Sequence, residues 1–323
     1  MPAYAETRPA SSRPPGGKAA GRGRTPGRAL ATALVHEGRL RLWFVVALWL
    51  TLAVCATVSV LAGRYSIEFS QFVTAIGEYA TGREFSDPNV GSVLLGVRLP
   101  RTALALFVGS GLAVAGAAFQ SVFSNPLATP DTLGVAAGTS IGAVLALILE
   151  WNLLGVQLLA LVFGLIAMGV TASIARHRGR TSIVMLVLAG VIVSAIANAV
   201  ISMLKIIADP TSKLPEITYW LMGSMAGVTF EAIALGVPLI ILGSLGIYLL
   251  RWRLNVLALS EDEARAAGLN LRLLRPIAII CATLITASVV SMCGQVGWIG
   301  LLVPHCARML VGNNNRVIIP VSL

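Results

Sequence analysis

Two arginines separated by a Leu-Pro pair, Arg98 and Arg101, stand at the start of a long apolar run. A guanidinium is permanently charged and donates hydrogen bonds in a fork that suits carboxylates. The pair can therefore dock an acidic partner. The same side chains can instead extend along apolar surface to reach lipid headgroups. The spacing alone leaves both interpretations open.

A second polar group lies in the stretch 251–275, which separates two apolar runs. Ser260 and Glu263 have the spacing of a capping box, in which each side chain satisfies a backbone amide at the start of a helix. Gly268 can adopt the left-handed conformation that ends a helix. We therefore expect a short surface helix over 261–267. It is either a merely solvated helix or a docking element for a cytoplasmic partner.

Two polar breaks interrupt the apolar pattern. The first contains Gln120 and Asn125, followed by Pro126 and Pro130, and paired prolines oppose a continuous helix. An ordinary polar turn and a constriction at the inner mouth of a pathway would each explain it. The second break, 297–305, starts a span with glycines and carries a proline and a histidine. A lone histidine there is read as a packed, hydrogen-bonded residue.

The motifs of enzymes and metal proteins are missing from the sequence. It contains no G-x-x-x-x-G-K-[ST] nucleotide-binding motif and no H-E-x-x-H metal motif. Its four cysteines lie singly in apolar runs, without metal-ligand spacing. The apolar segments carry almost no ionisable residue, which a proton or sodium relay would need. We expect no catalytic residue, no metal and no cofactor, and thus a protein that is not itself an enzyme.

The elements that position these residues are predicted to be membrane helices. Hydrophobic residues make up 56% of the 323 and charged residues 12%, whereas soluble domains carry about 25% charged residues. Apolar runs of roughly 18 or more residues recur, enough to cross a bilayer core of ~30 Å. The runs are continuous rather than alternating, which indicates helices instead of strands. The predicted spans are 42–62, 99–120, 132–149, 153–175, 183–207, 229–250, 276–293 and 298–312.

The basic N-terminal stretch sets the expected topology. Residues 1–41 hold eight of the 24 Lys and Arg residues against two carboxylates, and are rich in Pro, Gly and Ser. This composition predicts a disordered cytoplasmic tail rather than a nucleic-acid site. Alternating spans then put eighteen of the 24 cations on the cytoplasmic side, as the positive-inside rule expects. The stretch 251–275 falls inside, and the arginine pair outside.

The last residues, 316–323, read as the opening of a further span. An apolar stub of this length is too short to cross a bilayer. Either the chain is truncated, which is the preferred interpretation, or these residues pack against the bundle. The chain thus divides into the tail 1–41 and a transmembrane domain, 42–323, that is incomplete at its C-terminal end.

Several stretches, taken in order, resemble the FecCD-type permease family, the type II ABC importers for iron-siderophores, haem and vitamin B12. The matching stretches are Arg98-Leu-Pro-Arg101, Gln120 with Asn125-Pro-Leu-Ala, Leu188-Ala-Gly190, Trp220-Leu-Met-Gly-Ser224, Glu263–Gly268 and Gly297-Trp-Ile-Gly-Leu-Leu-Val-Pro-His305. The resemblance runs from about residue 42 to the end. It implies an all-α fold, a polytopic transmembrane helix bundle of the type II ABC importer permease kind. The family has ten spans; eight and the start of a ninth are present. Asn313-Asn-Asn-Arg316 departs from the Asp-His-Arg usually found there.

The resemblance also assigns roles to individual residues. The outward pair that docks a substrate-binding protein is Arg98 and Arg101. The coupling residues, seated in a groove of an ATPase subunit, are Glu263, Ala264, Ala267 and Gly268. The cytoplasmic gate comprises Asn125, Leu127, Thr181 and Ser182.

The function implied is that of the permease subunit of an ABC importer in the plasma or inner membrane, multi-pass with a cytoplasmic N-terminus. Its expected partners are two ATPase subunits, a periplasmic or lipid-anchored binding protein, a second permease subunit (identical or not) and membrane lipid, with no nucleic acid. The expected cargo is an iron-siderophore, or else haem or cobalamin, moved by alternating access that the ATPases drive. The alternatives are a stand-alone secondary transporter or channel, and a non-functional truncated permease.

Overall fold

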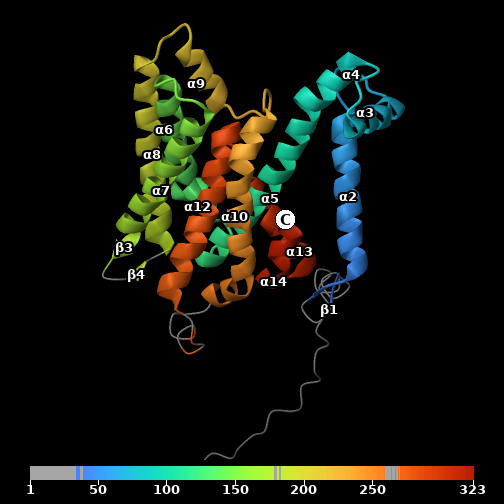
Figure 1. Cartoon of the computed structure of the whole chain (residues 1–323). Coiled ribbons are helices and arrows are strands. Elements are labelled where there is room, and N and C mark those ends of the chain that lie inside the picture. The colour runs from blue at the N-terminus through green and yellow to red at the C-terminus, as the bar shows by residue number, and fades with distance from the viewer. Residues whose placement is uncertain are drawn as a thin grey trace, which may run out of the picture.

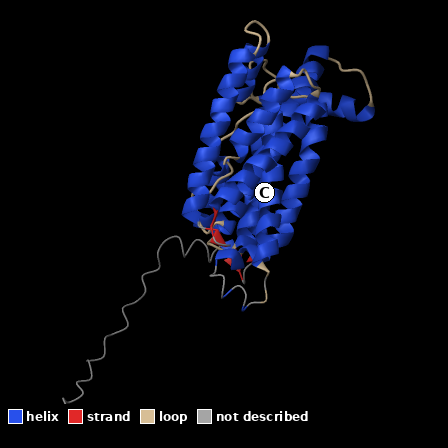
Figure 2. Cartoon of the chain, turned by 90° about the vertical axis from the view of Figure 1, so that its left-hand side faces the viewer, coloured by secondary structure: helices blue, strands red, loops and turns tan. Residues whose placement is uncertain are grey.

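The computed structural model describes residues 34–36, 39–177, 180–181, 183–258, 263, 266, 268 and 270–323. The described part of the chain is a bundle of helices whose long members share one approximate direction (Figure 1). Two antiparallel strand pairs lie at one end of the bundle (Figure 2). They are β1 (Val35–His36) with β2 (Arg39–Leu40), and β3 (Arg176–His177) with β4 (Arg180–Thr181). Most of the predicted tail, residues 1–33 and 37–38, lies outside the described residues.

Six helices among the described residues are long and apolar enough to cross a membrane. One is a continuous run from Pro88 to Val122, made of α4 (Pro88–Val93), the π-helical turn η1 (Leu94–Arg98) and α5 (Leu99–Val122). The others are α2 (Leu42–Leu61), α7 (Leu153–Ala175), α8 (Ile183–Ile207), α10 (Phe230–Leu254) and α12 (Leu271–Cys293). Each coincides with one predicted span, which confirms the all-α transmembrane fold.

The remaining two predicted spans are helices as well, but short ones. The helices α6 (Val135–Ile148) and α13 (Ile299–Val311) have 14 and 13 residues. At ~1.5 Å per residue each is about 20 Å long, less than a hydrocarbon core of ~30 Å. Neither is long enough to cross alone, and each follows a stretch without α-helix, 123–134 before α6 and 294–298 before α13. Between the first break and α6 lies the short helix η2 (Asp131–Leu133).

Burial differs strongly between the long helices. In the most apolar windows of Pro88–Val122 and of α12, 67% of residues are buried, against 6% in α2. The inner helices also hold the main core, around Leu104, Val108, Ile240 and Ile285. The helices α5 and α12 are therefore the centre of the bundle, and α2 is its least covered member.

Small residues allow α6 and α7 to pack closely. A Cβ atom on Gly138 would overlap the side chain of Ala167, and one on Gly142 would overlap the backbone carbonyl of Leu159. Glycines four residues apart on one face let two helix backbones approach in this way.

The two ends of the bundle carry different elements (Figure 1). One end, called the α9 end, holds α3 (Phe69–Thr81), α4 and α9 (Lys213–Leu221). The helices α3, α4 and α9 and the turn η1 fall in segments for which the sequence predicted plain connections. The opposite end, called the β3–β4 end, holds both strand pairs and the connection from α10 through η3 (Val256–Ala258) to α12.

The last helix, α14 (Asn315–Ser322), packs back onto the bundle. Val317, Ile318 and Ile319 are buried in the main core beside α5, α10 and α13. The C-terminal helix therefore packs against the bundle.

Candidate functional site

The arginine pair lies at the α9 end, at the junction of η1 and α5, but the two side chains differ in exposure. Arg98 is 8% exposed and donates hydrogen bonds to backbone carbonyls. Arg101 is exposed, and its Nε donates to the carbonyl of Met225 at 3.3 Å. The sequence assigned both arginines to one outward surface; of the two, only Arg101 has an exposed side chain.

The residues of the first polar break form a tight turn at the β3–β4 end of α5. Ser124 adopts a positive φ of 48°. The side-chain oxygen of Asn125 accepts from the amide of Leu127 at 2.9 Å, and its carbonyl accepts from Ala128 at 3.1 Å. Asn125 therefore fixes the turn, and it leaves the Leu127 side chain 67% exposed.

The other two predicted gate residues lie near the second strand pair. Thr181 belongs to β4. Its side chain, and the whole of Ser182, lie outside the described residues. The gate assigned by resemblance therefore remains a prediction for this pair.

The predicted coupling segment is described in part. Glu263 and Ala266 are helical and exposed, which agrees with a short surface helix over 261–267. Gly268 is exposed with φ of +72°, the left-handed conformation expected for a helix stop. Ala264 and Ala267, like Ser260 of the predicted capping box, lie outside the described residues.

Side-chain hydrogen bonds join the start of this segment to α5 and α14. The Ser124 hydroxyl donates to the carbonyl of Leu257 at 3.2 Å. The Asn255 side chain donates to the Asn314 side chain at 2.8 Å and accepts from the Asn315 amide at 2.7 Å. The Asn315 side-chain oxygen in turn accepts from Ser121, at 3.1 Å and buried. These six residues are called the polar chain below.

The sequence did not predict the polar chain, although it carried a signal for it. The run Asn313–Asn315 is the place where the chain departs from the family pattern. Asn314 and Asn315 are the two residues of that run that bond to Asn255. Beside them the Arg316 guanidinium lies over the Trp252 ring, 4.1 Å from its centroid, a cation–π contact that also joins α14 to α10.

A second polar contact lies where α13 meets α5. The Gln120 side chain donates to the carbonyl of Gly300 at 3.2 Å and accepts from the Arg308 guanidinium. Gln120 is 3% exposed, so the pairing with Arg308 supplies a partner to an amide that would otherwise be costly to bury. The first break is thus held to the second by hydrogen bonds.

The α9 end also carries acidic groups with depressed pKa values. Hydrogen bonds from the side chain and backbone of Thr211 and Ser212, led by the Thr211 hydroxyl, lower the pKa of Asp209 to about 2. The hydroxyl and amide of Ser86 lower the pKa of Glu78. Both carboxylates carry full charge near neutral pH.

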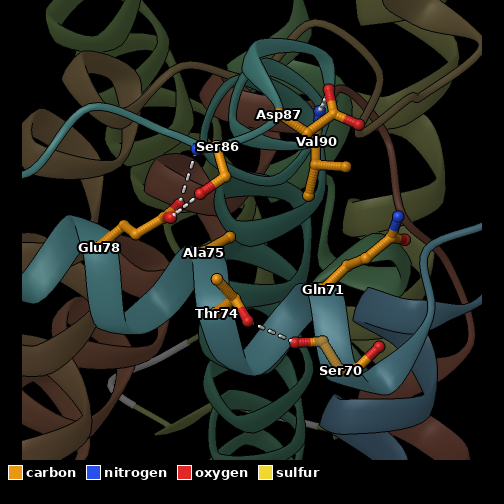
Figure 3. Close-up of a pocket in the computed structure, with 8 residues that line it drawn as sticks. All are labelled: Ser70, Gln71, Thr74, Ala75, Glu78, Ser86, Asp87 and Val90. Carbon is orange, nitrogen blue, oxygen red and sulfur yellow. Dashed lines mark hydrogen bonds between the residues drawn. The ribbon is translucent and has the colours of Figure 1, made fainter.

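Glu78 and Ser86 line a small cleft between α3 and α4 (Figure 3). Its volume is about 170 Å³, below the ~300–1,000 Å³ usual for small-molecule sites. None of the predicted docking, gate or coupling residues lines it. Within the described residues, no group of three or more His, Cys, Asp or Glu side chains is placed to hold a metal ion.

The geometry defines the class of the molecule: a polytopic α-helical membrane protein with exposed charged residues at both ends of its bundle. Comparison with known proteins narrows this class. A model of the FecCD transport family matches residues 51–323. The molybdate import system permease protein of Haemophilus influenzae is 37% identical over 277 residues, which are 85% of this chain and 82% of that protein. The cobalamin import system permease protein of Halobacterium salinarum is 35% identical over 76% of this chain and 66% of its own.

A solved structure agrees with these relatives. It is described as an inward-facing conformation of a metal-chelate type ABC transporter, and it superposes with a TM-score of 0.74 at 34% identity. The match covers 87% of this chain and 84% of that one. The chain belongs to the FecCD transport family and is an integral membrane protein with the fold of an ABC importer permease.

Proposed function

We propose that this chain is the membrane-spanning permease subunit of an ABC importer, with its α9 end outside the cell and its β3–β4 end in the cytoplasm. The observation that carries the proposal is the position of its two exposed contact groups. Arg101 lies at the start of α5 and Glu263 in the connection between α10 and α12, at opposite ends of the bundle (Figure 1). Each is offered to a different partner: a substrate-binding protein outside, and an ATPase subunit inside.

The mechanism proposed is alternating access. Two ATPase subunits hold the coupling segments of two permease subunits and draw them together when ATP binds. The movement reaches the turn at Asn125 and Leu127, which opens or closes the cytoplasmic end of the path. The permease supplies the path, and ATP hydrolysis in its partners supplies the free energy.

The iron-siderophore is our first candidate for the cargo, because the matched structure is described as that of a metal-chelate type transporter. Molybdate is a second candidate, because the Haemophilus relative with 37% identity is a molybdate permease. Uptake of radiolabelled ferric siderophore, molybdate and cobalamin into proteoliposomes distinguishes them. The cargo is the compound whose uptake requires both the binding protein and ATP.

Charge reversal at the coupling segment tests the function itself. Glu263→Arg is expected to lower ATP-driven uptake about tenfold, which corresponds to about 1.4 kcal/mol of docking free energy, while membrane insertion is retained. Glu231→Arg is the matched control, because Glu231 is also exposed but begins α10 at the α9 end. Uptake without ATPase subunits would instead identify a secondary transporter or channel. Equal uptake by both variants would reject the coupling role of Glu263.

A further inference from the structure

The helix α3 lies across the direction of the long helices, at the level where α2 ends (Figure 1). It follows α2 after the short connection 62–68. A small cluster of buried side chains holds it there, in which Ala75 of α3 packs with Val60 at the end of α2 and with Val90 of α4. Because α2 is long and apolar enough to cross the membrane, its end marks the bilayer surface. The helix α3 therefore runs along that surface.

The polar face of α3 is turned toward the protein. Ser70, Gln71, Thr74 and Glu78 line the cleft between α3 and α4 (Figure 3). Glu78 accepts hydrogen bonds there from the amide and the hydroxyl of Ser86. A surface helix of a soluble protein has the opposite arrangement, with its apolar stripe on the core and its polar face in water.

The apolar side chains of α3 point away from the bundle. Phe69, Val73 and Ile76 are 62%, 52% and 40% exposed, and their spacing of four and three residues places them on one face of the helix. These three residues are called the α3 apolar face. Glu78 is the single charged residue of α3, so no charge interrupts this face. Exposed apolar surface that continues over several residues indicates a contact with a membrane or a partner.

The surroundings indicate that lipid covers the α3 apolar face. The preceding span α2 has 6% of its most apolar window buried, so its side chains meet acyl chains up to the point where α3 begins to follow the surface. Exposed Arg64 and Arg83 flank α3 on its two sides. Arginines in such positions extend to lipid phosphates. Exposed Tyr79, at the edge of the face, is of a type enriched where membrane meets water.

We propose that α3 is an interfacial anchor whose apolar face inserts at the boundary between headgroups and acyl chains, while Arg64 and Arg83 contact lipid phosphates. The bonds between Glu78 and Ser86 tie the anchor to the segment before α4. Lipid contact at α3 thereby sets the height of the continuous run from Pro88 to Val122. The anchor stands on the contacts of α3 alone; only its assignment to the outer leaflet rests on the proposed function.

Fluorescence quenching of the whole protein in nanodiscs tests the insertion. In a chain whose four native cysteines are replaced, bimane is attached to Val73→Cys or to Thr74→Cys. Both parent residues are exposed and adjacent, but only Val73 lies on the α3 apolar face. Brominated phosphatidylcholine should quench the Val73 label several-fold more than the Thr74 label, and iodide should quench them in the reverse order. Equal quenching by the lipid would overturn the anchor. A Val73 label that neither quencher reaches would overturn it too, because protein would then cover the face.

Hydrogen exchange of unlabelled chains tests the same anchor without a probe. In nanodiscs, Val73→Gln should quicken exchange of the α3 amides several-fold, since a buried side-chain amide weakens insertion, whereas Thr74→Gln should leave it unchanged. Equal exchange in the two variants would contradict the insertion.

The arginine contacts are tested by lipid composition. Exchange in α3 of the wild type should be slower in an equal mixture of phosphatidylcholine and phosphatidylglycerol than in phosphatidylcholine alone, because cations near the surface are attracted to anionic lipid. Arg64→Gln combined with Arg83→Gln should remove this difference and keep the order of quenching at Val73 and Thr74. A difference that persists in the double variant would show that the two arginines do not hold lipid. Failure of ATP-driven uptake would reject the proposed function and leave these results standing.

Discussion

Gly116 on α5 and Gly300 on α13 touch through their backbones: a Cβ atom on Gly116 would overlap the carbonyl oxygen of Gly300. The same carbonyl accepts the hydrogen bond from Gln120, one turn further along α5. The contact between the two helices therefore depends on the absence of a single methyl group. It holds the polar break that precedes α13 against the centre of the bundle.

Gly116→Ala is expected to destabilise the protein by about 1–3 kcal/mol, the usual cost of forcing an added group into a packed core. Thermal unfolding of the detergent-solubilised protein measures the effect. Gly109→Ala is the matched control on the same helix, because a Cβ there meets no atom within 4 Å. A Gly116→Ala variant as stable as Gly109→Ala would contradict the close contact.

The spans could be predicted because the bilayer imposes a length and a composition that are visible along the chain. Each of the eight predicted segments is a helix. The helices α3 and α9 were missed because they are short and carry polar residues such as Gln71 and Glu216. They lack the long apolar run by which the spans were recognised.

The docking pair shows where prediction from the sequence ends. Arg98 and Arg101 have the same side chain and lie three residues apart, so nothing in the local sequence distinguishes them. They differ in their hydrogen bonds because the end of α2 lies against Arg98. The Arg98 guanidinium donates to the carbonyl of Leu61, which is 37 residues earlier in the chain. The polar chain is non-local in the same way, because Asn255 and Asn315 are 60 residues apart. The sequence gives the residue types, and the packing of the spans decides which of them meet.

The polar chain should transmit movement from the coupling segment to the cytoplasmic turn. Asn255→Ala removes its bonds to Asn314 and Asn315, and Ser124→Ala removes the bond to Leu257. We expect the double variant to hydrolyse ATP in the assembled importer but to move several-fold less cargo per ATP. Uptake and phosphate release, measured on the same proteoliposomes, give this ratio.

A control and a rescue distinguish transmission from a loss of folding. Asn89→Ala is the control, since the Asn89 side chain is exposed at the α9 end and, among the described contacts, makes no hydrogen bond. Restoring Ser124 in the Asn255→Ala background returns the hydroxyl and should recover part of the ratio. A wild-type ratio in the double variant would show that the polar chain does not carry the movement.

The left-handed backbone of Gly268 should be required for the coupling segment to end correctly. A β-branched residue is strained at φ of +72°, whereas asparagine tolerates this region. Gly268→Val is expected to weaken co-purification of the ATPase subunits, and Gly268→Asn to retain most of it. Because a Cβ at this position meets no atom within 4 Å, a difference between the two variants reports backbone conformation rather than a clash. Equal retention would show that the segment does not need this conformation.

Asp209 should hold the connection between α8 and α9 in a form that resists acid. One oxygen of its carboxylate accepts from the amide and hydroxyl of Thr211, at 2.9 and 2.6 Å, and from those of Ser212, at 2.8 and 3.0 Å. These bonds favour the charged form and lower the pKa from 3.8 to about 2. For a carboxyl whose pKa is lower in the folded state, the stabilisation is complete above the unfolded value and is lost as the pH falls through the folded one.

Amide hydrogen exchange at Thr211 and Ser212 should therefore stay slow from neutral pH to about 4, after correction for the intrinsic rate, and quicken as the pH approaches about 2. Asp209→Asn keeps an oxygen acceptor without the charge and should exchange faster than the wild type at pH 7, with no further change on acidification. Protection that fades already near pH 5 in the wild type would show that these bonds do not hold the carboxylate.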